Sequence, residues 1–341
     1  AALIGQANLG EEVTRDLYKT FRKTPSVTLE TIQDTIREEG LAWLDILRPN
    51  DRVRQFLLEQ MEFDELAVED VFGPADTTAQ KFKNHRFIVI NARDADNQLD
   101  TEPVAIFIKE NLIITTRHYS IPALKKFRGR FKKADDEDLA LGIDFLLYEL
   151  LDAIADDWTP ILNSYSRQLD QLEFQVFDPS KKYDNILESI HDLKRYLREA
   201  SKSIESLNTV TMRLLKPNER LIGSGAERYF SDLHQLSIAL VKRANNYSSG
   251  ATSARDSYLS NISMQLAESN AQLTEVMTTL TIIGAIMLPL TLIAGIFGMN
   301  SDGLPLNQIG GFWGIIGLML LFATTMLTFF WRRGWLKTYE E

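Results

Sequence analysis

The chain has 341 residues, with 47 acidic and 37 basic side chains and a formal net charge of −10. This balance argues against nucleic acid as a partner and favours a protein that gathers cations. The chain contains no cysteine, which excludes disulfides and thiolate metal sites and fits a mainly cytoplasmic protein. Residues 1–10 lack the basic start and apolar run of a signal peptide, so we expect none.

Residues 1–135 show the pattern of an α/β domain. Two segments, Asn50–Gln60 and Glu62–Asp70, are predicted to be helical, and Lys109-Glu110-Asn111 predicts a hairpin turn. The predicted strands are runs rich in β-branched residues: Ser26–Ile32, Leu41–Leu47, Arg86–Asn91, Pro103–Ile108 and Leu112–Thr116.

From residue 136 the pattern changes to long amphipathic helices. Helices over 137–175 and 181–215 would form a helical hairpin spanning 136–222. A third helix begins near Ala226 and meets no proline until Pro289, so it would continue to Phe297. At ~1.5 Å per residue it would be about 108 Å long. Such a helix needs neighbours to pack against, which predicts an oligomer. Its weakest point is Ser248-Ser249-Gly250, where helix propensity is poor.

Two uncharged runs at the C-terminus, Val276–Ser301 and Gly303–Trp331, are each longer than the ~20 residues that a membrane-spanning helix needs. The alternative for such a run is a buried helix of a soluble protein. Basic residues follow the second run, at Arg332, Arg333 and Lys337, and none lies between the runs. The positive-inside rule therefore predicts a multi-pass protein of the inner or plasma membrane with both termini in the cytoplasm. The predicted segments are a stalk continuing into the first span (223–297), an external loop (298–309), a second span (310–331) and a basic tail (332–341).

The triplet Gly298-Met299-Asn300 stands at the end of the first span. Gly298 lets the backbone turn and expose its carbonyl, and Asn300 offers a carboxamide oxygen. A ring of such neutral oxygens suits a hard divalent cation that keeps its hydration water. The alternative is a simple helix C-cap, because Gly and Asn are common there.

One side of the first span is mostly apolar and contains a single hydroxyl. Its residues recur at helical spacing: Met277, Leu280, Gly284, Leu288, Thr291 and Gly295. This face is typical of a pore that gates by dewetting. It is equally typical of a helix-packing face, in which the glycines allow close approach.

Several segments together resemble the CorA family of divalent-cation transporters. In the membrane region they are Glu275–Met277, Leu280–Ile283, Leu288–Thr291, Ile293–Ile296 and Phe297–Asn300. Upstream they are Trp43–Ile46, Glu69–Val71, Leu150–Asp157 and His191–Arg195, so the resemblance covers most of the chain.

This resemblance implies a funnel-shaped homopentamer in a lipid bilayer, with an α/β cytoplasmic domain, a helical stalk and two transmembrane helices. Gly298, Met299 and Asn300 would form an outer selectivity ring. Thr291 would be a polar station, Met277, Leu280 and Leu288 hydrophobic girdles, and Thr274 a polar residue at the pore mouth. Intracellular metal would bridge Asp70, with Glu69, to Asp232 of a neighbouring subunit and favour the closed state.

The external loop departs from the family's magnesium transporters. It keeps Asp302 but has Leu306 after Pro305, where a second acid is usual, and Ser301–Asn307 resembles the zinc-transporting, ZntB-like branch. The first hypothesis is therefore a transporter of divalent cations, chiefly Mg²⁺, driven inward by the membrane potential. A zinc transporter, with or without proton coupling, is the alternative within the family. A membrane-anchored metal sensor or scaffold without flux is the alternative outside it.

Other site patterns are weak. Asp94-Ala95-Asp96-Asn97 begins like a calcium-binding loop but lacks its glycine and final Glu, so a hairpin turn is predicted. His85, His118, His191 and His234 stand far apart, without the spacing of a zinc site. No Gly-rich phosphate loop and no nucleophile–base pair is recognisable. We therefore expect no ATP, no organic cofactor and no enzymatic activity.

Overall fold

The structure is a computed structural model, and it describes residues 2–6, 15–17, 20–22, 41–95, 101–131, 141–178, 185–217, 219, 221–298 and 311–335. The chain divides into two compact units, Ala1–Ser257 and Tyr258–Glu341, and the division falls inside one long helix. The predicted strand Ser26–Ile32 lies outside the described residues.

The first unit is built on an eight-stranded mixed sheet with the order β3-β2-β1-β4-β8-β7-β6-β5. β4 lies between β1 and β8 and is parallel to both, whereas all other neighbours are antiparallel. The strands are β1 (Ala2–Gln6), β2 (Arg15–Leu17), β3 (Thr20–Arg22), β4 (Leu41–Leu47), β5 (Thr78–Lys81), β6 (Arg86–Arg93), β7 (Thr101–Lys109) and β8 (Leu112–Arg117).

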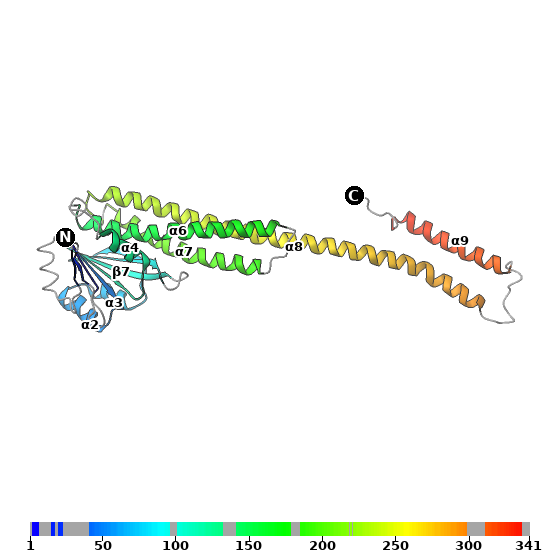
Figure 1. The fold of residues 1–341 in the computed structure, drawn as a ribbon, viewed down its shortest axis with the longest axis horizontal. Coiled ribbons are helices and arrows are strands. Elements are labelled where there is room, and N and C mark those ends of the chain that lie inside the picture. The colour runs from blue at the N-terminus through cyan, green and yellow to red at the C-terminus, as the bar shows by residue number, and fades with distance from the viewer. Residues whose placement is uncertain are drawn as a thin grey trace. The chain divides into compact units, whose positions relative to one another are not determined.

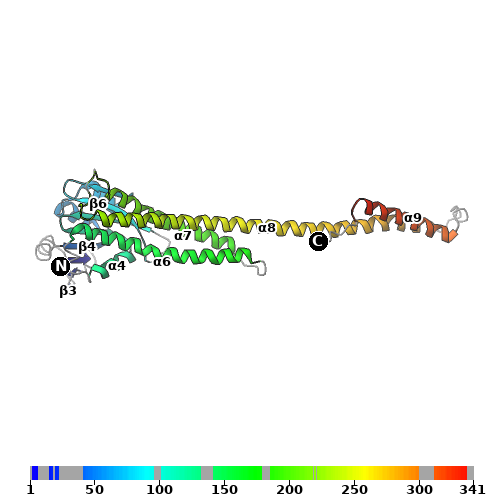
Figure 2. The same cartoon turned by 90° about the horizontal axis from the view of Figure 1, so that it is seen from above.

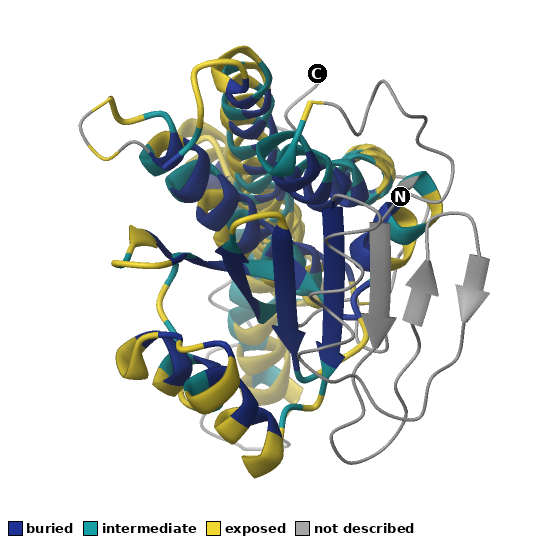
Figure 3. Ribbon diagram, turned by 90° about the vertical axis from the view of Figure 1, so that its left-hand side faces the viewer, coloured by how far each residue is buried: buried dark blue, intermediate teal, exposed yellow. Residues whose placement is uncertain are grey.

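Three short helices cover one face of the sheet: α2 (Asp51–Gln55), η1 (Phe56–Gln60) and α3 (Glu65–Phe72). Because side chains alternate along a strand, Ala42, Leu44 and Ile46 of β4 all point to this face and join one buried core with these helices. The chain enters α2 through Asn50, whose Oδ1 accepts hydrogen bonds from the backbone N–H groups of Arg52 and Val53, each at 3.1 Å. The central strands are buried along nearly their whole length (Figure 3).

The opposite face of the sheet is covered by α4 (Pro122–Phe131), α6 (Ile143–Phe177) and α7 (Ile186–Leu214). α7 is joined to β6 at Asn91, where the backbone N–H donates to Ser206 Oγ and the carbonyl accepts from Ser203 Oγ, both at 2.7 Å. These bonds satisfy buried polar groups on both sides and hold the helix in register with the strand.

The third long helix is α8 (Glu227–Gly298), which runs beside α6 and α7 in the first unit (Figures 1 and 2). α8 is continuous through Ser248-Ser249-Gly250, so the predicted weak point does not interrupt it. A Cβ atom built at Gly250 would lie 2.8 Å from Leu169 Cδ2 of α6. The glycine therefore allows the close approach of two helices, and tertiary packing outweighs its poor helix propensity.

Four predicted strands, Leu41–Leu47, Arg86–Asn91, Pro103–Ile108 and Leu112–Thr116, are confirmed as β4, β6, β7 and β8. The hairpin turn is confirmed too, because Lys109 pairs with Leu112 across it and Glu110 adopts a positive φ of 51°.

Two helix starts were predicted too early. The helix expected from Glu62 begins at Glu65, because Glu62 has a φ of 55° and Asp64 caps the helix. The helix expected from residue 137 begins at Ile143, after Gly142 with a φ of 84°. Sequence reasoning also missed β5 and α4, the first a four-residue strand at the sheet edge and the second a strongly basic helix.

A buried ion pair connects β4 to its surroundings. Asp45 is fully buried and accepts from Arg117 Nε at 3.0 Å, from Arg117 Nη2 at 2.7 Å and from Thr115 Oγ1 at 2.9 Å. Arg128 Nη2 of α4 reaches the same carboxylate at 3.2 Å. The two arginines neutralise the Asp45 charge, which burial would otherwise make costly.

We predict that Asp45→Ala lowers the free energy of unfolding by about 3–5 kcal/mol, because it leaves buried arginine charge unpaired. Urea titration of the full-length protein, followed by tryptophan fluorescence, measures this. The matched control is Asp192→Ala, which removes an exposed partner 3.4 Å from Arg195 and should cost less than about 1 kcal/mol. Equal losses in the two variants would contradict the proposed role of burial.

His85 is a buried histidine packed among aromatic rings, with its ring centroid 4.8 Å from that of Phe82. Its Nδ1 lies 2.7 Å from Asn84 Oδ1, and its Nε2 has no hydrogen-bond partner in the described part of the chain. Burial lowers the pKa of His85 to about 4, Lys109 adds to the lowering and Asp64 opposes it.

The unfolded chain therefore binds more protons than the folded chain between about pH 6.5 and pH 4. We predict that stability falls as pH decreases through this window, by up to about 3 kcal/mol from this one group. Urea midpoints measured from pH 7 to pH 4 should show a shallower fall in His85→Phe than in the unmodified protein. An unchanged slope in the variant would contradict the assignment.

Candidate cation pathway and carboxylate sites

The second unit contains two helical segments that are long and apolar enough to cross a membrane: the C-terminal part of α8 and α9 (Gly311–Arg332). The 22 residues of α9 span about 33 Å, close to the ~30 Å thickness of a bilayer's hydrocarbon core. Large hydrophobic side chains are exposed along both helices, among them Leu292, Phe312, Trp313 and Trp331. An apolar surface of this extent indicates contact with lipid or with other protein chains.

The predicted pore face of α8 is uncovered in the single chain. Met277, Leu280 and Leu288 expose 70, 69 and 73 % of their surface, and Thr274, Thr291 and Gly295 are also exposed. Gly284 is half-buried, yet a Cβ atom built there or at Gly295 would meet no other atom within 4 Å. The described part of this unit therefore does not use these glycines for close helix packing.

The opposite side of α8 is the covered one. At ~100° per residue, this side lies across the helix axis from the predicted pore face. Its residues are all buried or half-buried: Thr278, Ile282, Ile286, Pro289, Ile293 and Phe297. α9 runs beside this end of α8 (Figures 1 and 2). α8 thus has one side that is covered within the chain and one that is available to other chains.

The threonines of the predicted pore face donate their hydroxyl hydrogens to their own helix. Thr291 Oγ1 donates to the Met287 carbonyl and Thr274 Oγ1 to the Asn270 carbonyl, both at 2.8 Å. Because the hydrogen is used in this way, each hydroxyl oxygen keeps its lone pairs as acceptors. An oxygen in this state can receive hydrogen bonds from the water around a hydrated cation.

Gly298 is the last residue of α8, and a Cβ atom built there would meet nothing within 4 Å. Met299, Asn300 and Asp302 lie outside the described residues, as do the rest of the loop after Gly298 and the part of the basic tail beyond Trp335. The oxygen ring at this corner therefore stays a prediction.

Glu69 and Asp70 lie in the last turn of α3. Asp70 is half-buried and lines a small cavity of ≈ 20 Å³ together with Thr116 and His118. Burial raises the pKa of Asp70, and the negative charges of Glu69 and Asp76 raise it further. Asp76 is an acidic neighbour that sequence reasoning missed, because it lies in the loop after the helix.

Asp232 lies in α8 opposite a second acidic group on α6. Burial is the main cause that raises the pKa of Asp152. Asp156 and Asp232 raise this pKa further, whereas Arg130 lowers it. Arg130 donates to Asp152 Oδ2 at 2.7 Å and also contacts Asp156. The sequence analysis included Asp152 and Asp156 only in a segment that resembles the family. A signal was present, because Asp152, Asp156 and Asp157 are three acids in a short stretch of one helix.

The same negative charge acts on the pKa of Tyr148. Its pKa is raised to about 12, by burial first and then by Asp152, Glu149 and Asp232. Asp232 is therefore close enough to Tyr148 and Asp152 of its own chain to act on them electrostatically, while Arg130 balances part of the negative charge on α6.

Within one chain, the structure does not bring the carboxylates around Asp70 together with those around Asp232. Among the described residues, no three His, Asp or Glu side chains are arranged to hold a metal ion within one chain. The histidines contact other groups: His118 Nε2 lies 3.0 Å from the Val71 carbonyl and His234 Nδ1 3.0 Å from Thr211 Oγ1. A metal site at Asp70 or Asp232 would need further ligands from outside the described part of this chain, so the intersubunit site stays a prediction.

Residues 38–333 match the family described as "CorA-like Mg2+ transporter protein". The chain belongs to the CorA-like family. It is 27 % identical over 334 residues to the cobalt/magnesium transport protein CorA of Thermotoga maritima, covering 95 % of this chain and 92 % of that protein.

Two solved structures share the CorA-like fold. The complete CorA magnesium transporter of Methanocaldococcus jannaschii matches with a TM-score of 0.66 at 21 % identity, over 97 % of this chain and 98 % of that one. The ZntB cytoplasmic domain of Vibrio parahaemolyticus matches with a TM-score of 0.56 at 13 % identity, over 65 % of this chain and 88 % of that one. The predicted family and the combination of an α/β domain, a long helix and two candidate membrane helices are thereby confirmed, and the number of subunits stays a prediction.

Proposed function

We propose that this chain forms a homopentameric membrane channel that carries divalent cations, chiefly Mg²⁺, into the cell. Membership of the CorA-like family supports the transport of divalent cations. The observation that carries the pore assignment is the uncovered, uncharged face of α8, which leads to Gly298 while α8's other side is covered. Symmetric association of several copies through such a helix places five identical faces around one axis.

Ion passage follows from the chemistry of that face. Met277, Leu280 and Leu288 offer no oxygen, so a ring of each would empty of water when narrow and block ions. The Thr291 hydroxyls provide acceptors between these girdles and the outer end. At the outer end, the Gly298 carbonyl and the Asn300 carboxamide would bind the hydration shell of the ion without removing it.

The membrane potential supplies the driving force in this proposal. It contributes ~2.3 kcal/mol per elementary charge per 100 mV, hence about 4.6 kcal/mol for a divalent cation. Both termini and the acidic first unit lie in the cytoplasm, where the negative potential concentrates cations. No nucleotide is needed for inward transport.

Regulation by cytoplasmic metal is the second part of the proposal. Asp70, with Glu69 beside it, would share a cation with Asp232 of the adjacent subunit. Negative neighbours already disfavour the charged form of Asp70, and Asp232 raises the pKa of Asp152, so both places hold repulsion that a cation would relieve. Bound metal would favour the closed pentamer, and loss of the metal would allow the pentamer to open.

We predict that Asn300→Ala abolishes Mg²⁺ uptake into proteoliposomes while the oligomer remains intact by size-exclusion chromatography with light scattering. The matched control is Asn307→Ala, which removes another carboxamide from the same loop and should leave uptake largely unchanged. Normal uptake in Asn300→Ala would disprove the selectivity ring. Metal binding without any flux in the unmodified protein would instead support a membrane-anchored sensor.

We predict that Asp70→Asn combined with Asp232→Asn weakens the inhibition of flux by Mg²⁺ on the cytoplasmic side by at least about tenfold in concentration, since each site loses a charged ligand. Glu65→Gln combined with Glu227→Gln is the matched control, because it removes one acid from each of the same helices. Unchanged inhibition in the first variant would contradict the intersubunit metal site.

A zinc transporter is the second candidate, and the loop favours it. Leu306 stands after Pro305 where magnesium transporters of the family usually carry an acid, and Ser301–Asn307 resembles the ZntB-like branch. Flux of Mg²⁺ and Zn²⁺ in the same proteoliposomes, with and without a pH gradient, separates the two. Zinc flux that depends on the gradient, without magnesium flux, would replace the magnesium assignment.

A further inference from the structure

A basic cavity lies between α7 and α8, away from the carboxylates described above. Its volume is ≈ 270 Å³. The residues that line it are Leu187, Ile190, His191, Lys194, Arg195, Arg198 and Arg255. All of them belong to the unit Ala1–Ser257, so one compact unit forms the whole cavity.

The charge of the lining is opposite to that of the protein. Four of the seven lining residues are Lys or Arg, a fifth is His and none is Asp or Glu, in a chain with a formal net charge of −10. On α7, His191, Lys194, Arg195 and Arg198 recur at i, i+3, i+4 and i+7, which places them on one side of the helix. Like charges at this spacing repel one another and destabilise a helix unless an anion lies between them.

Nearby acids neutralise only the rim. Arg195 lies 3.4 Å from Asp192 and Arg255 lies 2.9 Å from Asp256, and all four side chains are at least 40 % exposed. Exposed pairs of this kind are weak. Lys194 and Arg198 have no ion pair or hydrogen bond in the part of the chain that the structure describes.

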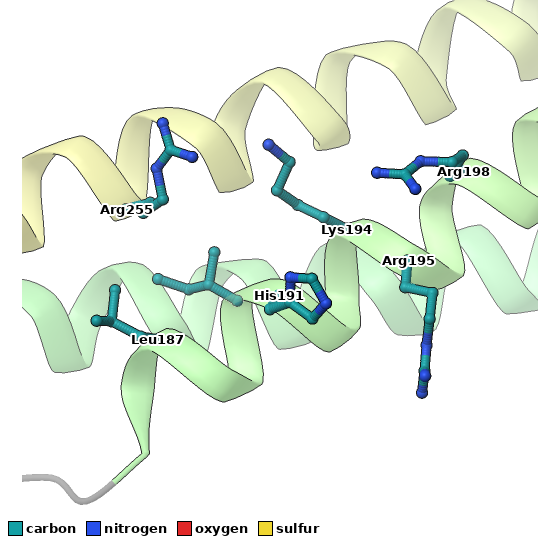
Figure 4. Close-up of a pocket in the computed structure, with 7 residues that line it drawn as sticks. Leu187, His191, Lys194, Arg195, Arg198 and Arg255 are labelled. Atoms are coloured by element: carbon teal, nitrogen blue, oxygen red, sulfur yellow. The ribbon is translucent and has the colours of Figure 1, made fainter.

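The unpaired cations point into the space between the helices. Figure 4 shows the Lys194 side chain extending towards α8 and the Arg198 guanidinium directed along α7 towards Lys194, whereas Arg195 points away from α8. Arg255 lies on α8 at the edge of the cavity, with its guanidinium directed away from α7 and paired with Asp256, and His191 lies between Leu187 and Lys194. Leu187 and Ile190 add an apolar part to the lining, where less water competes for the charges.

We infer that this cavity binds a phosphate-bearing anion, held by Lys194 and Arg198, with His191 as a further polar contact and Arg255 adding positive charge at the edge. A phosphoryl group offers several acceptor oxygens and more than one negative charge, which suits an arginine fork and a lysine point charge arriving from different directions. The volume admits one or two phosphoryl groups but not a folded segment of another protein. A bound phosphate would join α7 to α8 and restrict the movement of one helix relative to the other.

The phosphate can come from two sources, a free anion such as pyrophosphate or the headgroup of an anionic lipid. This inference is independent of the proposed cation transport, because it uses none of the residues of the pore face or of the carboxylate sites. Its test accordingly measures anion binding and does not rely on ion flux.

The first experiment is calorimetric titration of sodium pyrophosphate into full-length protein in phosphatidylcholine nanodiscs, in buffer without divalent metal. We expect saturable binding, weakened at least about tenfold in Lys194→Gln combined with Arg198→Gln. The matched control, Lys202→Gln combined with Lys242→Gln, removes the same charge from exposed positions of the same two helices and should bind like the unmodified protein.

The second experiment distinguishes the sources by acylating exposed lysines and measuring the modification of Lys194 and Lys202 by mass spectrometry. Protection of Lys194, but not Lys202, by pyrophosphate in phosphatidylcholine nanodiscs indicates a free phosphate. The same protection by phosphatidylglycerol nanodiscs without pyrophosphate indicates a lipid headgroup. Protection by neither, or equal weakening of pyrophosphate binding in both double variants, would overturn the inference.

Discussion

The constraint on which this structure depends is that one helix, α8, must satisfy two different solvents. Its first half packs in water against α6 and α7, where Gly250 allows the backbones to approach. Its second half carries no charge from Val276 onward and exposes large hydrophobic side chains. A helix satisfies its own backbone hydrogen bonds in either solvent, so only the side chains need to change along its length. An uninterrupted helix can therefore link a domain that folds in water with a membrane-spanning segment.

The same constraint explains why a single chain leaves so much unsatisfied. In the second unit one side of α8 is covered and the other is open, and the open side is the one that combines girdle-like apolar residues with Thr274 and Thr291. In the first unit the carboxylates of α3 and of α6 with α8 repel their own neighbours, and the described residues hold no complete metal site within one chain. In the proposed pentamer, symmetric copies would complete both the pore and the metal site.

Much of the fold could be predicted because its signals are local. β4 and β8 are short runs rich in buried apolar and β-branched residues, and the Lys109–Asn111 turn has the composition of a hairpin. Short or basic elements such as β5 and α4 were missed because tertiary contacts stabilise them, as Arg128 of α4 shows by reaching Asp45. The helix starts at Glu65 and Ile143 depend on backbone angles at Glu62 and Gly142, which periodicity does not report.

The sequence by itself determined the two membrane-length helices, the apolar face of the first one and the resemblance to CorA, because length, absence of charge and helical period are properties of consecutive residues. Only the tertiary structure decided which side of that helix is covered, that Asp76 and Asp152 are acidic neighbours of Asp70 and Asp232, and that Lys194 and Arg198 share a cavity with Arg255. The relations of Asp152 with Asp232 and of Lys194 with Arg255 join residues far apart in the chain. Their electrostatic energies depend on distance and burial in space, and separation along the sequence reports neither.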